Sequence, residues 1–364
     1  MKIADIIQYL ETYAPVYFQE SYDNAGLLTG DNALKCKGII TALDVTEAVV
    51  EEAITKHCNL IVAHHPIIFK GLKSLTGKNY VEKIVLKAIK NDIAIYAIHT
   101  NLDNIKKGVN KKIAEKLGLQ NIRVLQPKEQ ILKKLITFAP VNDAEKVRQA
   151  LFSAGGGHLG KYSECSFNTE GKGTFKPEEG ANPFVGKIGE RHTEKEIKIE
   201  VIFPSYLQTQ VINAMIEAHP YEEVAYDIIS LGNYLTDVGG GLIGEIAPAD
   251  EKIFFKKIKT AFKIKVIKHT ALLNKKIKKV AICGGAGSFL IPVALSSGAD
   301  IYITSDIKYH EFFDADNKMV LADIGHYESE QFTIDLLYDI LRGKYPNFAV
   351  LKTEVNSNPV NYFL

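Results

Sequence analysis

Short apolar runs that alternate with helical patterns constrain the fold of this chain more than any other feature. GIITALDV (38–45) precedes a helical pattern for which Thr46 is a suitable N-cap, and NLIVAHHP (59–66) and IAIYAIHT (93–100) are two further buried strands. Strand–helix–strand alternation implies right-handed crossovers and a mainly parallel sheet that is covered by helices. The first third of the chain is therefore predicted to be α/β.

The same alternation returns near the end of the chain. The ranges 280–287, 301–306 and 319–326 have the composition of buried strands, and 327–345 has the periodicity of one long amphipathic helix. Gly343 and Pro346 supply a stop signal for that helix. Both ends of the chain thus predict the same α/β class.

The middle of the chain has a different organisation. A strand and a helix are followed by a polar, glycine-rich stretch (155–182), an alternating strand (196–204), a second helix and a last strand. The order β-α-β-β-α-β is typical of a ferredoxin-like α+β domain. We therefore expect an α/β host domain in two halves, 1–130 and 233–364, that carries an inserted domain at 131–232.

Composition excludes several classes of protein. With 364 residues, 46% hydrophobic and 24% charged, the chain is long enough for more than one soluble domain. Its formal net charge of +1 gives no reason to expect nucleic acid or an anionic membrane as the partner. No apolar run reaches the length of a membrane span, and the first residues do not form a signal peptide. Four cysteines without a CxxC pair argue against disulfides and against a thiolate zinc site, so a cytoplasmic location is expected.

Two groups of candidate ligands follow apolar strands in the first half. His64 and His65 end one strand, and adjacent side chains that diverge can bind two different metals; alternatively, one ring bonds a carbonyl and the other is exposed. Asp103 offers a hard oxygen that can bridge two cations, although an Asx turn or a helix cap is an alternative. His99 is a candidate ligand, outer hydrogen-bond donor or proton carrier.

A third group follows a strand in the second half. His326 and Glu330 are four residues apart, so the first turn of a helix places them on one face, where they can hold the same metal. The spacing alone is also common on exposed helices. Together, the three groups offer histidine and carboxylate ligands without thiol, and five ligands suit two cations with a shared bridge better than one tetrahedral ion. Zinc is expected first, with iron, manganese or nickel as alternatives.

Two further segments are weaker candidates. The glycine-rich turn from Cys283 to Ser288 could present amides to a phosphate, with a tight turn that binds nothing as the alternative. Asp306, Lys308 and His310 follow the next strand and could line the same crevice.

Several of these segments resemble the NIF-three-like family, whose members carry the name type-two GTP cyclohydrolase I. The resemblance rests on motifs in both halves of the host: SYDNAGLLTGD (21–31), LIVAHHPIIFKGLKSL (60–75), YAIHTNLDN (96–104), TSDIKYHEFFDA (304–315) and DIGHYESE (323–330). It implies two divalent metal ions per subunit on His64, His65, Asp103, His326 and Glu330, with Glu330 as the bridge. It also implies a toroidal homohexamer whose metal sites face an internal cavity.

The middle segment resembles the insert of the longer members of that family, which is similar to the trimeric CutA and PII folds. HPYEEVAYDI (219–228) is the most recognisable stretch. His219 and Glu222 could suggest a second metal site there. A structural or trimer-contact role is preferred, because the segment changes from helix to strand within a few residues.

The function expected first is hydrolysis of a small molecule, a purine nucleotide among others. On the GTP hypothesis, metal-held hydroxide attacks C8 of guanine and formate leaves, with His99 or His310 moving protons. The alternative is a metal-dependent regulatory or scaffold protein without turnover, in which the insert acts as sensor or cap. A metal-handling chaperone is a third hypothesis.

Overall fold

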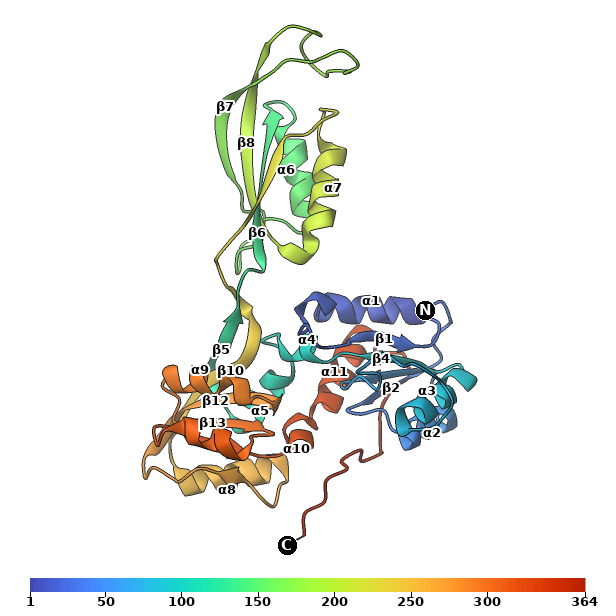
Figure 1. Ribbon diagram of the computed structural model, residues 1–364, viewed down its shortest axis with the longest axis vertical. Helices are drawn as coiled ribbons and strands as arrows, with labels where there is room; N and C mark the ends of the chain where they lie inside the picture. Colours follow the sequence, from blue (N-terminus) through green and yellow to red (C-terminus); the bar gives the residue numbers. More distant parts are fainter. Residues whose placement is uncertain (364) are drawn as a thin grey trace. The chain divides into compact units, whose positions relative to one another are not determined.

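The chain divides into two compact units, which we describe separately (Figure 1). The computed structural model describes residues 1–363, so Leu364, the end of the predicted third segment, lies outside the described residues. The host unit comprises Met1–Pro127 and the chain from Thr236 onward, and the insert comprises Lys128–Leu235. Within the described residues, no helix is both long and apolar enough to cross a bilayer.

The first half of the host forms a five-stranded sheet. Its order is β1-β4-β3-β2-β15, with bounds Gly26–Thr29, Ala94–Ala97, Leu60–Ala63, Ile39–Ala42 and Val350–Lys352. Only β1 pairs antiparallel, and the other pairings are parallel. Every residue of β2, β3 and β4 is buried, as expected for parallel strands covered on both faces.

Helices cover this sheet on its two sides. Helices α2 (Glu47–Thr55) and α3 (Tyr80–Lys90) pack on one face, and Figure 1 shows α1 (Ile3–Tyr13) on the opposite side. The predicted N-cap is confirmed, since the Thr46 side chain accepts a hydrogen bond from the Val49 amide at 3.3 Å.

The second half forms a separate sheet of six strands. Its order is β11-β14-β13-β12-β10-β5, with bounds Lys268–His269, Val320–Asp323, Ile301–Ser305, Lys276–Ala286, Leu235–Asp250 and Gln120–Lys128. The three strands β12, β13 and β14 are parallel, whereas β10 and β11 pair antiparallel. The host therefore contains two mixed sheets, and its two halves exchange strands: β15 joins the first sheet and β5 joins the second.

The prediction of one long helix over 327–345 is wrong. The structure has α10 (His326–Glu330) and α11 (Thr333–Lys344), with a break at Gln331 and Phe332. The two pieces belong to different layers, since α10 packs on β12 and β13 while α11 packs on β15 and β2. One straight helix could not serve both sheets.

The remaining elements of the host are short connections and covering helices. Helices α5 and α8 pack on β12, and α9 contributes to the core of the six-stranded sheet. Their bounds, with those of the other short elements, are η1 Val16–Phe18, α4 Thr100–Asp103, α5 Val109–Leu117, α8 Glu251–Phe262, η3 Ser288–Leu290, α9 Ile291–Ser296 and η4 Tyr309–Ala315.

The insert has a four-stranded antiparallel sheet in the order β7-β8-β6-β9. Along the chain its elements are β6 Leu132–Pro140, α6 Ala144–Ser153, β7 Phe167–Phe175, β8 His192–Pro204, η2 Ser205–Leu207, α7 Gln208–Ala218 and β9 Tyr226–Ser230. The predicted β-α-β-β-α-β order is therefore present. Its core lies between one face of the sheet and the two helices.

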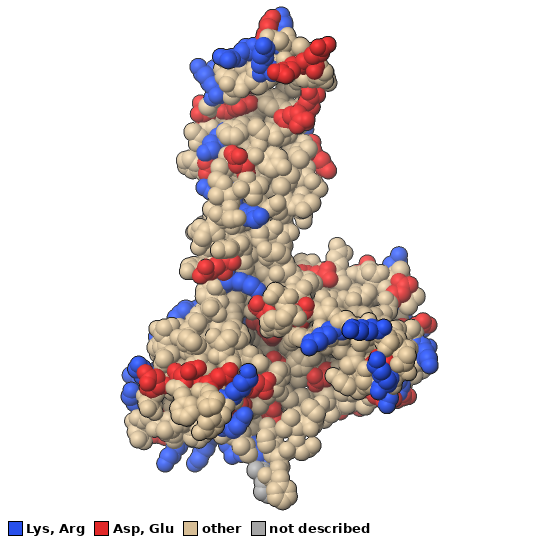
Figure 2. Space-filling view, in the orientation of Figure 1, with Lys and Arg blue, Asp and Glu red and all other residues tan. Residues whose placement is uncertain are grey.

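Charged side chains are mixed on the face drawn in Figure 2. Lysines and arginines alternate with acidic residues in small groups on this face, without a continuous basic field. This distribution agrees with the nearly neutral net charge of +1.

Candidate metal centre

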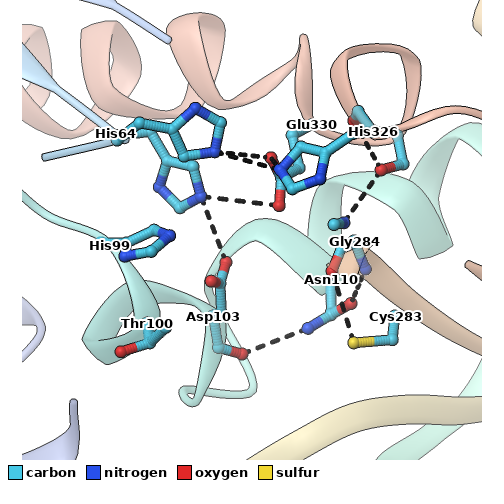
Figure 3. A network of polar contacts seen from close by, with 12 residues as sticks. His64, His99, Thr100, Asp103, Asn110, Cys283, Gly284, His326 and Glu330 are labelled. Carbon is cyan, nitrogen blue, oxygen red and sulfur yellow. Dashed lines mark hydrogen bonds and ion pairs between the residues drawn. The ribbon is translucent and has the colours of Figure 1, made fainter. Parts of the chain in front are cut away.

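The carboxyl ends of parallel strands from both sheets deliver the candidate ligands. His64 and His65 directly follow β3, and His99 follows β4 by two residues. His326 and Glu330 lie on α10, which begins three residues after β14. Figure 3 shows His64, Asp103, His326 and Glu330 with their polar ends turned toward one another.

Of three groups of possible ligand atoms, one joins His64, His65 and His99, and the other two share one carboxylate. One group is His64, Asp103 and Glu330, and the other is His65, His326 and Glu330; within each, the ligand atoms lie within 4.8 Å of one another. Glu330 Oε2 lies 3.0 Å from His65 Nε2 and 3.1 Å from His326 Nε2, whereas Oε1 lies 3.8 Å from His64 Nε2. Each oxygen of Glu330 thus faces a different group, as a bridging carboxylate would.

Every histidine of the cluster has its outer ring nitrogen bound to an acceptor. The Nδ1–H of His64 donates to the Ile98 carbonyl at 2.8 Å. The other three donate to aspartates: His65 to Asp44 at 2.7 Å, His99 to Asp23 at 2.7 Å and His326 to Asp306 at 2.5 Å. This arrangement fixes the tautomer and aims each Nε2 inward, as is usual for metal-binding histidines.

Two buried polar atoms of the cluster lack a hydrogen-bond partner within the described residues. They are His64 Nε2 and Asp103 Oδ1, which lie 3.5 Å apart. Leaving a buried polar group unsatisfied costs about 1–3 kcal/mol, so the pair needs a further partner. A divalent cation would satisfy both, and the imidazole and carboxylate donors without thiol suit zinc, iron, manganese or nickel.

The carboxylates of the cluster favour positive charge on two of its histidines. Burial alone would lower the pKa of His65, but hydrogen bonds with Asp44 and Glu330 outweigh it and raise the pKa to about 10. The same balance raises the pKa of His326 to about 9, through Glu330 and Asp306. Burial and the charge of Glu330 raise the pKa of Asp103 well above its ordinary value. This carboxylate would gain most from a cation beside it.

The glycine-rich turn serves the cluster by close packing. The amides of Gly284 and Gly285 already donate to Asn110 Oδ1 and Ser329 Oγ, each at 2.9 Å, so neither is directed at a phosphate. Gly285 has a φ of +64°, and a Cβ there would come within 2.2 Å of Glu330 Oε1. The turn therefore has the shape that the Glu330 side chain requires.

The predicted residues separate into those that the structure gathers and those that it does not. His99 joins the cluster, since its ring centroid lies 5.2 Å from that of His64 and 5.4 Å from that of His65. Asp306 joins it through His326. The structure does not gather His310, which is exposed and stacks on Phe313 of its own segment.

The second candidate pair, in the insert, has ordinary structural partners. His219 Nε2 donates to the Phe138 carbonyl at 2.9 Å, and its Nδ1 accepts from the Tyr221 amide at 3.1 Å. Both nitrogens of this ring are therefore occupied. Glu222 accepts from the Asn182 amide at 2.9 Å.

Two of the aspartates that hold histidine rings were missed in the sequence. Asp44 lies two residues beyond β2, so its place at a strand end was an available signal. Asp23 lies in an irregular loop, and its signal was its place in the family motif SYDNAGLLTGD (21–31). Burial would raise the pKa of Asp23, but hydrogen bonds from His99 and Thr100 lower it to about 2. Asp23 is thus a charged partner for His99 at neutral pH.

A cavity of about 710 Å³ adjoins the cluster. Its wall includes His65, His326 and residues of the extended C-terminal segment, such as Asn358 and Tyr362. Ser357, in the same C-terminal segment, donates a hydrogen bond to Asp44 Oδ2 at 2.6 Å. The aspartate that holds His65 is therefore itself held by this segment.

This chain is similar in sequence and structure to a family of known proteins. A family model described as Duf34/NIF3 (NGG1p interacting factor 3) matches residues 1–359. Curated proteins named GTP cyclohydrolase 1 type 2 homolog are 41% identical in Halalkalibacterium halodurans, over 100% of both chains, and 38% identical in Bacillus subtilis, over 98% and 97%. The crystal structure of a Bacillus cereus protein related to NIF3 has a TM-score of 0.85 and 39% identity, over 100% of this chain and 99% of that one. The similarity includes the host unit and the insert.

Proposed function

Because this chain belongs to the Duf34/NIF3 family, we propose that it is a hydrolase that works with two divalent metal ions at the Glu330 cluster. One observation carries the proposal: Glu330 directs its two oxygens at two separate ligand groups, and one group has two buried atoms that lack a hydrogen-bond partner among residues 1–363. A single ion would leave one group without a metal. The ligand chemistry favours zinc, with iron, manganese and nickel as alternatives.

The proposed roles follow from the contacts. His64 and Asp103 hold one ion, His65 and His326 hold the other, and Glu330 is shared. Divalent ions in such a centre supply Lewis acidity and lower the pKa of a coordinated water. Asp44 and Asp306 keep the rings of His65 and His326 oriented. His99 is the proton carrier, since its ring lies beside both adjacent histidines and Asp23 holds its Nδ1–H.

The substrate is a small molecule that enters the adjoining cavity of about 710 Å³. GTP is the specific candidate, because curated relatives are named GTP cyclohydrolase 1 type 2 homolog. The wall carries four carboxylates, Asp44, Asp306, Asp323 and Glu328, and one lysine, Lys268, which is paired with Asp323 at 2.6 Å. We therefore expect an uncharged ring, rather than a triphosphate, to contact this wall.

The test combines metal content with turnover. Wild-type protein loaded with zinc is compared with Glu330→Gln and with Glu115→Gln, a control at an exposed position of α5 that belongs to no ligand group and does not line the cavity. Metal is counted by plasma mass spectrometry, and GTP, guanosine and a set of phosphoesters are assayed by chromatography and formate release. We expect about two ions per chain and a rate that falls about 100-fold in Glu330→Gln but stays near wild type in the control.

The outcomes separate the hypotheses. If metal-loaded protein binds two ions but turns over nothing in the panel, the regulatory or scaffold alternative replaces the hydrolase. Unchanged metal content in a His64→Ala, His326→Ala double variant would overturn the ligand assignment itself.

We also propose that the subunit assembles into a homohexamer and works in the cytoplasm. Large aromatic side chains of the host support association, because Phe289, Tyr309 and Phe313 are 62%, 73% and 66% exposed in the single chain. The four cysteines are all free, which suits a reducing compartment. The observed strand order of the insert supports its assignment to the CutA/PII type. Native mass spectrometry tests the assembly.

A further inference from the structure

The insert contains a second cavity of about 710 Å³. No residue of the metal centre lines it. It lies against the face of the sheet that α6 and α7 leave uncovered. Along β8, Ile199, Val201 and Phe203 point into the core beneath the helices, so Glu196 and Lys198 point to the other face and line the cavity. The rest of the wall comes from Phe138 of β6, from β7, from the loop that follows β7 and from the 221–225 segment.

The motif HPYEEVA (219–225) fixes one wall of this cavity. His219 bonds to the Phe138 carbonyl through one ring nitrogen and to the Tyr221 amide through the other, so the turn between helix and strand is held in place. The ring of Tyr221 packs at 4.9 Å from His219. Glu222 accepts from the Asn182 amide and so ties the loop after β7 to the same turn. His219 and Glu222 therefore hold one wall of this cavity in place.

Aromatic rings form a large part of the lining. Tyr221, Phe175 and Phe184 all line the cavity, and the centroid of Tyr221 lies 6.0 Å from that of Phe175 and 6.2 Å from that of Phe184. Phe184 is 56% exposed, which is unusual for a phenylalanine without an external partner. The three rings lie together on β7, the following loop and the motif.

One carboxylate is buried among these rings. Glu196 is 8% exposed, and its Oε1 accepts a hydrogen bond from the Tyr221 hydroxyl at 2.9 Å. A Cβ at Gly173 would come within 2.0 Å of Glu196 Oε2, so the glycine on β7 leaves room for that oxygen. Of the three lysines that line the cavity, Lys198 pairs with Glu200. Within residues 1–363, no cationic side chain forms an ion pair with Glu196.

We propose that this cavity binds a small organic cation, an amine or a quaternary ammonium, between the aromatic rings and Glu196. Aromatic faces attract cations, and desolvation strengthens that attraction. A buried carboxylate without a cationic partner supplies the counter-charge. The lining as a whole has five glutamates, Glu170, Glu178, Glu196, Glu222 and Glu223, against three lysines, Lys172, Lys176 and Lys198, so its charge disfavours an anion. The site does not depend on the proposed hydrolase activity.

Binding of defined probes to the full-length protein tests this proposal. Choline, phenethylamine and agmatine are titrated by calorimetry and by NMR, and 3,3-dimethylbutan-1-ol serves as the neutral isostere of choline. We expect at least one cation to bind saturably with a dissociation constant of about 1 mM or lower. For choline, we expect the neutral isostere to bind about tenfold more weakly.

Variants locate the site. Glu196→Gln preserves shape and removes charge, and Tyr221→Leu removes a ring; each is expected to weaken cation binding about tenfold. Glu217→Gln, on the exposed surface of α7, is the matched control and should bind as wild type. Circular dichroism establishes that each variant is folded, and if Glu196→Gln is not, Tyr221→Leu and Phe175→Leu decide the question.

The proposal is overturned if none of the three cations binds at about 10 mM, or if the neutral isostere binds as well as choline. Cation binding that is unaffected in a folded Glu196→Gln protein would likewise overturn it. If a second copy of the chain covers the cavity instead, the probes should not bind and Tyr221→Leu should change the oligomeric state. This outcome also contradicts the proposal.

Discussion

His65 and Glu330 lie 265 positions apart in the chain, yet His65 Nε2 is 3.0 Å from Glu330 Oε2. The histidine follows a strand of the five-stranded sheet, and the glutamate lies on a helical turn packed on the six-stranded sheet. The two layers of the host therefore meet at the metal centre. Ions bound there would tie the layers together, so metal binding and host stability should be linked.

Metal should raise the thermal stability of the wild-type protein. At a free metal concentration about 1,000 times the dissociation constant, one site adds about 4 kcal/mol if the unfolded chain does not bind. Differential scanning calorimetry with zinc and with a chelator measures the shift. Glu330→Gln should show little of it, and an equal shift in that variant would contradict the link.

The two ligand groups should be separable by mutation. Asp103→Asn weakens the group with His64, and His326→Ala weakens the group with His65. We expect each variant to retain about one ion where the wild type holds about two, because Glu330 still serves the other group. Plasma mass spectrometry after dialysis measures this stoichiometry. Loss of both ions in both variants would show that the groups act as one.

Asp306 should act on the metal through His326. Asp306→Asn keeps a side chain of similar size but weakens the hold on the Nδ1–H, so we expect metal affinity to fall about 10- to 100-fold. Competition with a coloured chelator measures the affinity. Asp314→Asn, in the same exposed segment, is the control and should leave affinity unchanged.

Gly285 should be less tolerant of substitution than Gly298. Both have a left-handed backbone, with φ of +64° and +70°, so alanine at either position costs about 1–2 kcal/mol. At Gly285 the new Cβ also meets Glu330 Oε1, while at Gly298 the nearest neighbour is the flexible Lys279 Nζ at 3.9 Å. Gly285→Ala should therefore lose more stability and also lose metal, whereas Gly298→Ala should lose only stability. Urea unfolding and metal content distinguish the two.

Glu82 should make stability depend on pH in the acid range. Amides and hydroxyls of Ser74–Asn79 donate to this 2%-exposed carboxylate and lower its pKa to about 2, from about 4.5 in an unfolded chain. A depressed folded pKa stabilises the protein above about pH 4.5, and this stabilisation is lost as the pH falls toward 2. Glu82→Gln should lower the urea midpoint at pH 7, and the difference from wild type should shrink below pH 4.5. Glu115→Gln, an exposed glutamate, should show no such trend.

Local patterns were enough to predict much of the fold. Apolar runs marked the parallel strands of both sheets, because strands buried on both faces need continuous hydrophobic sequence. Residues that follow the carboxyl ends of such strands were marked as candidates because these ends face the ligand crevice of an α/β sheet. The structure brings together His64, His65, Asp103, His326 and Glu330. The i, i+4 spacing of His326 and Glu330 needed only helix geometry.

What the sequence alone determined is therefore which segments form strands and helices, and which side chains stand at strand ends. The tertiary structure decided which strands pair, so that β15 joins β2 and β5 joins β10. It also decided that Asp44 and Asp306 hold histidine rings, that Glu330 reaches His65, and that His310 stays outside. The physical reason is range: periodicity and capping record contacts within a few residues, whereas these contacts join distant segments, such as Thr41 and Leu351, which are 310 positions apart. Their energies depend on the packing of both sheets at once.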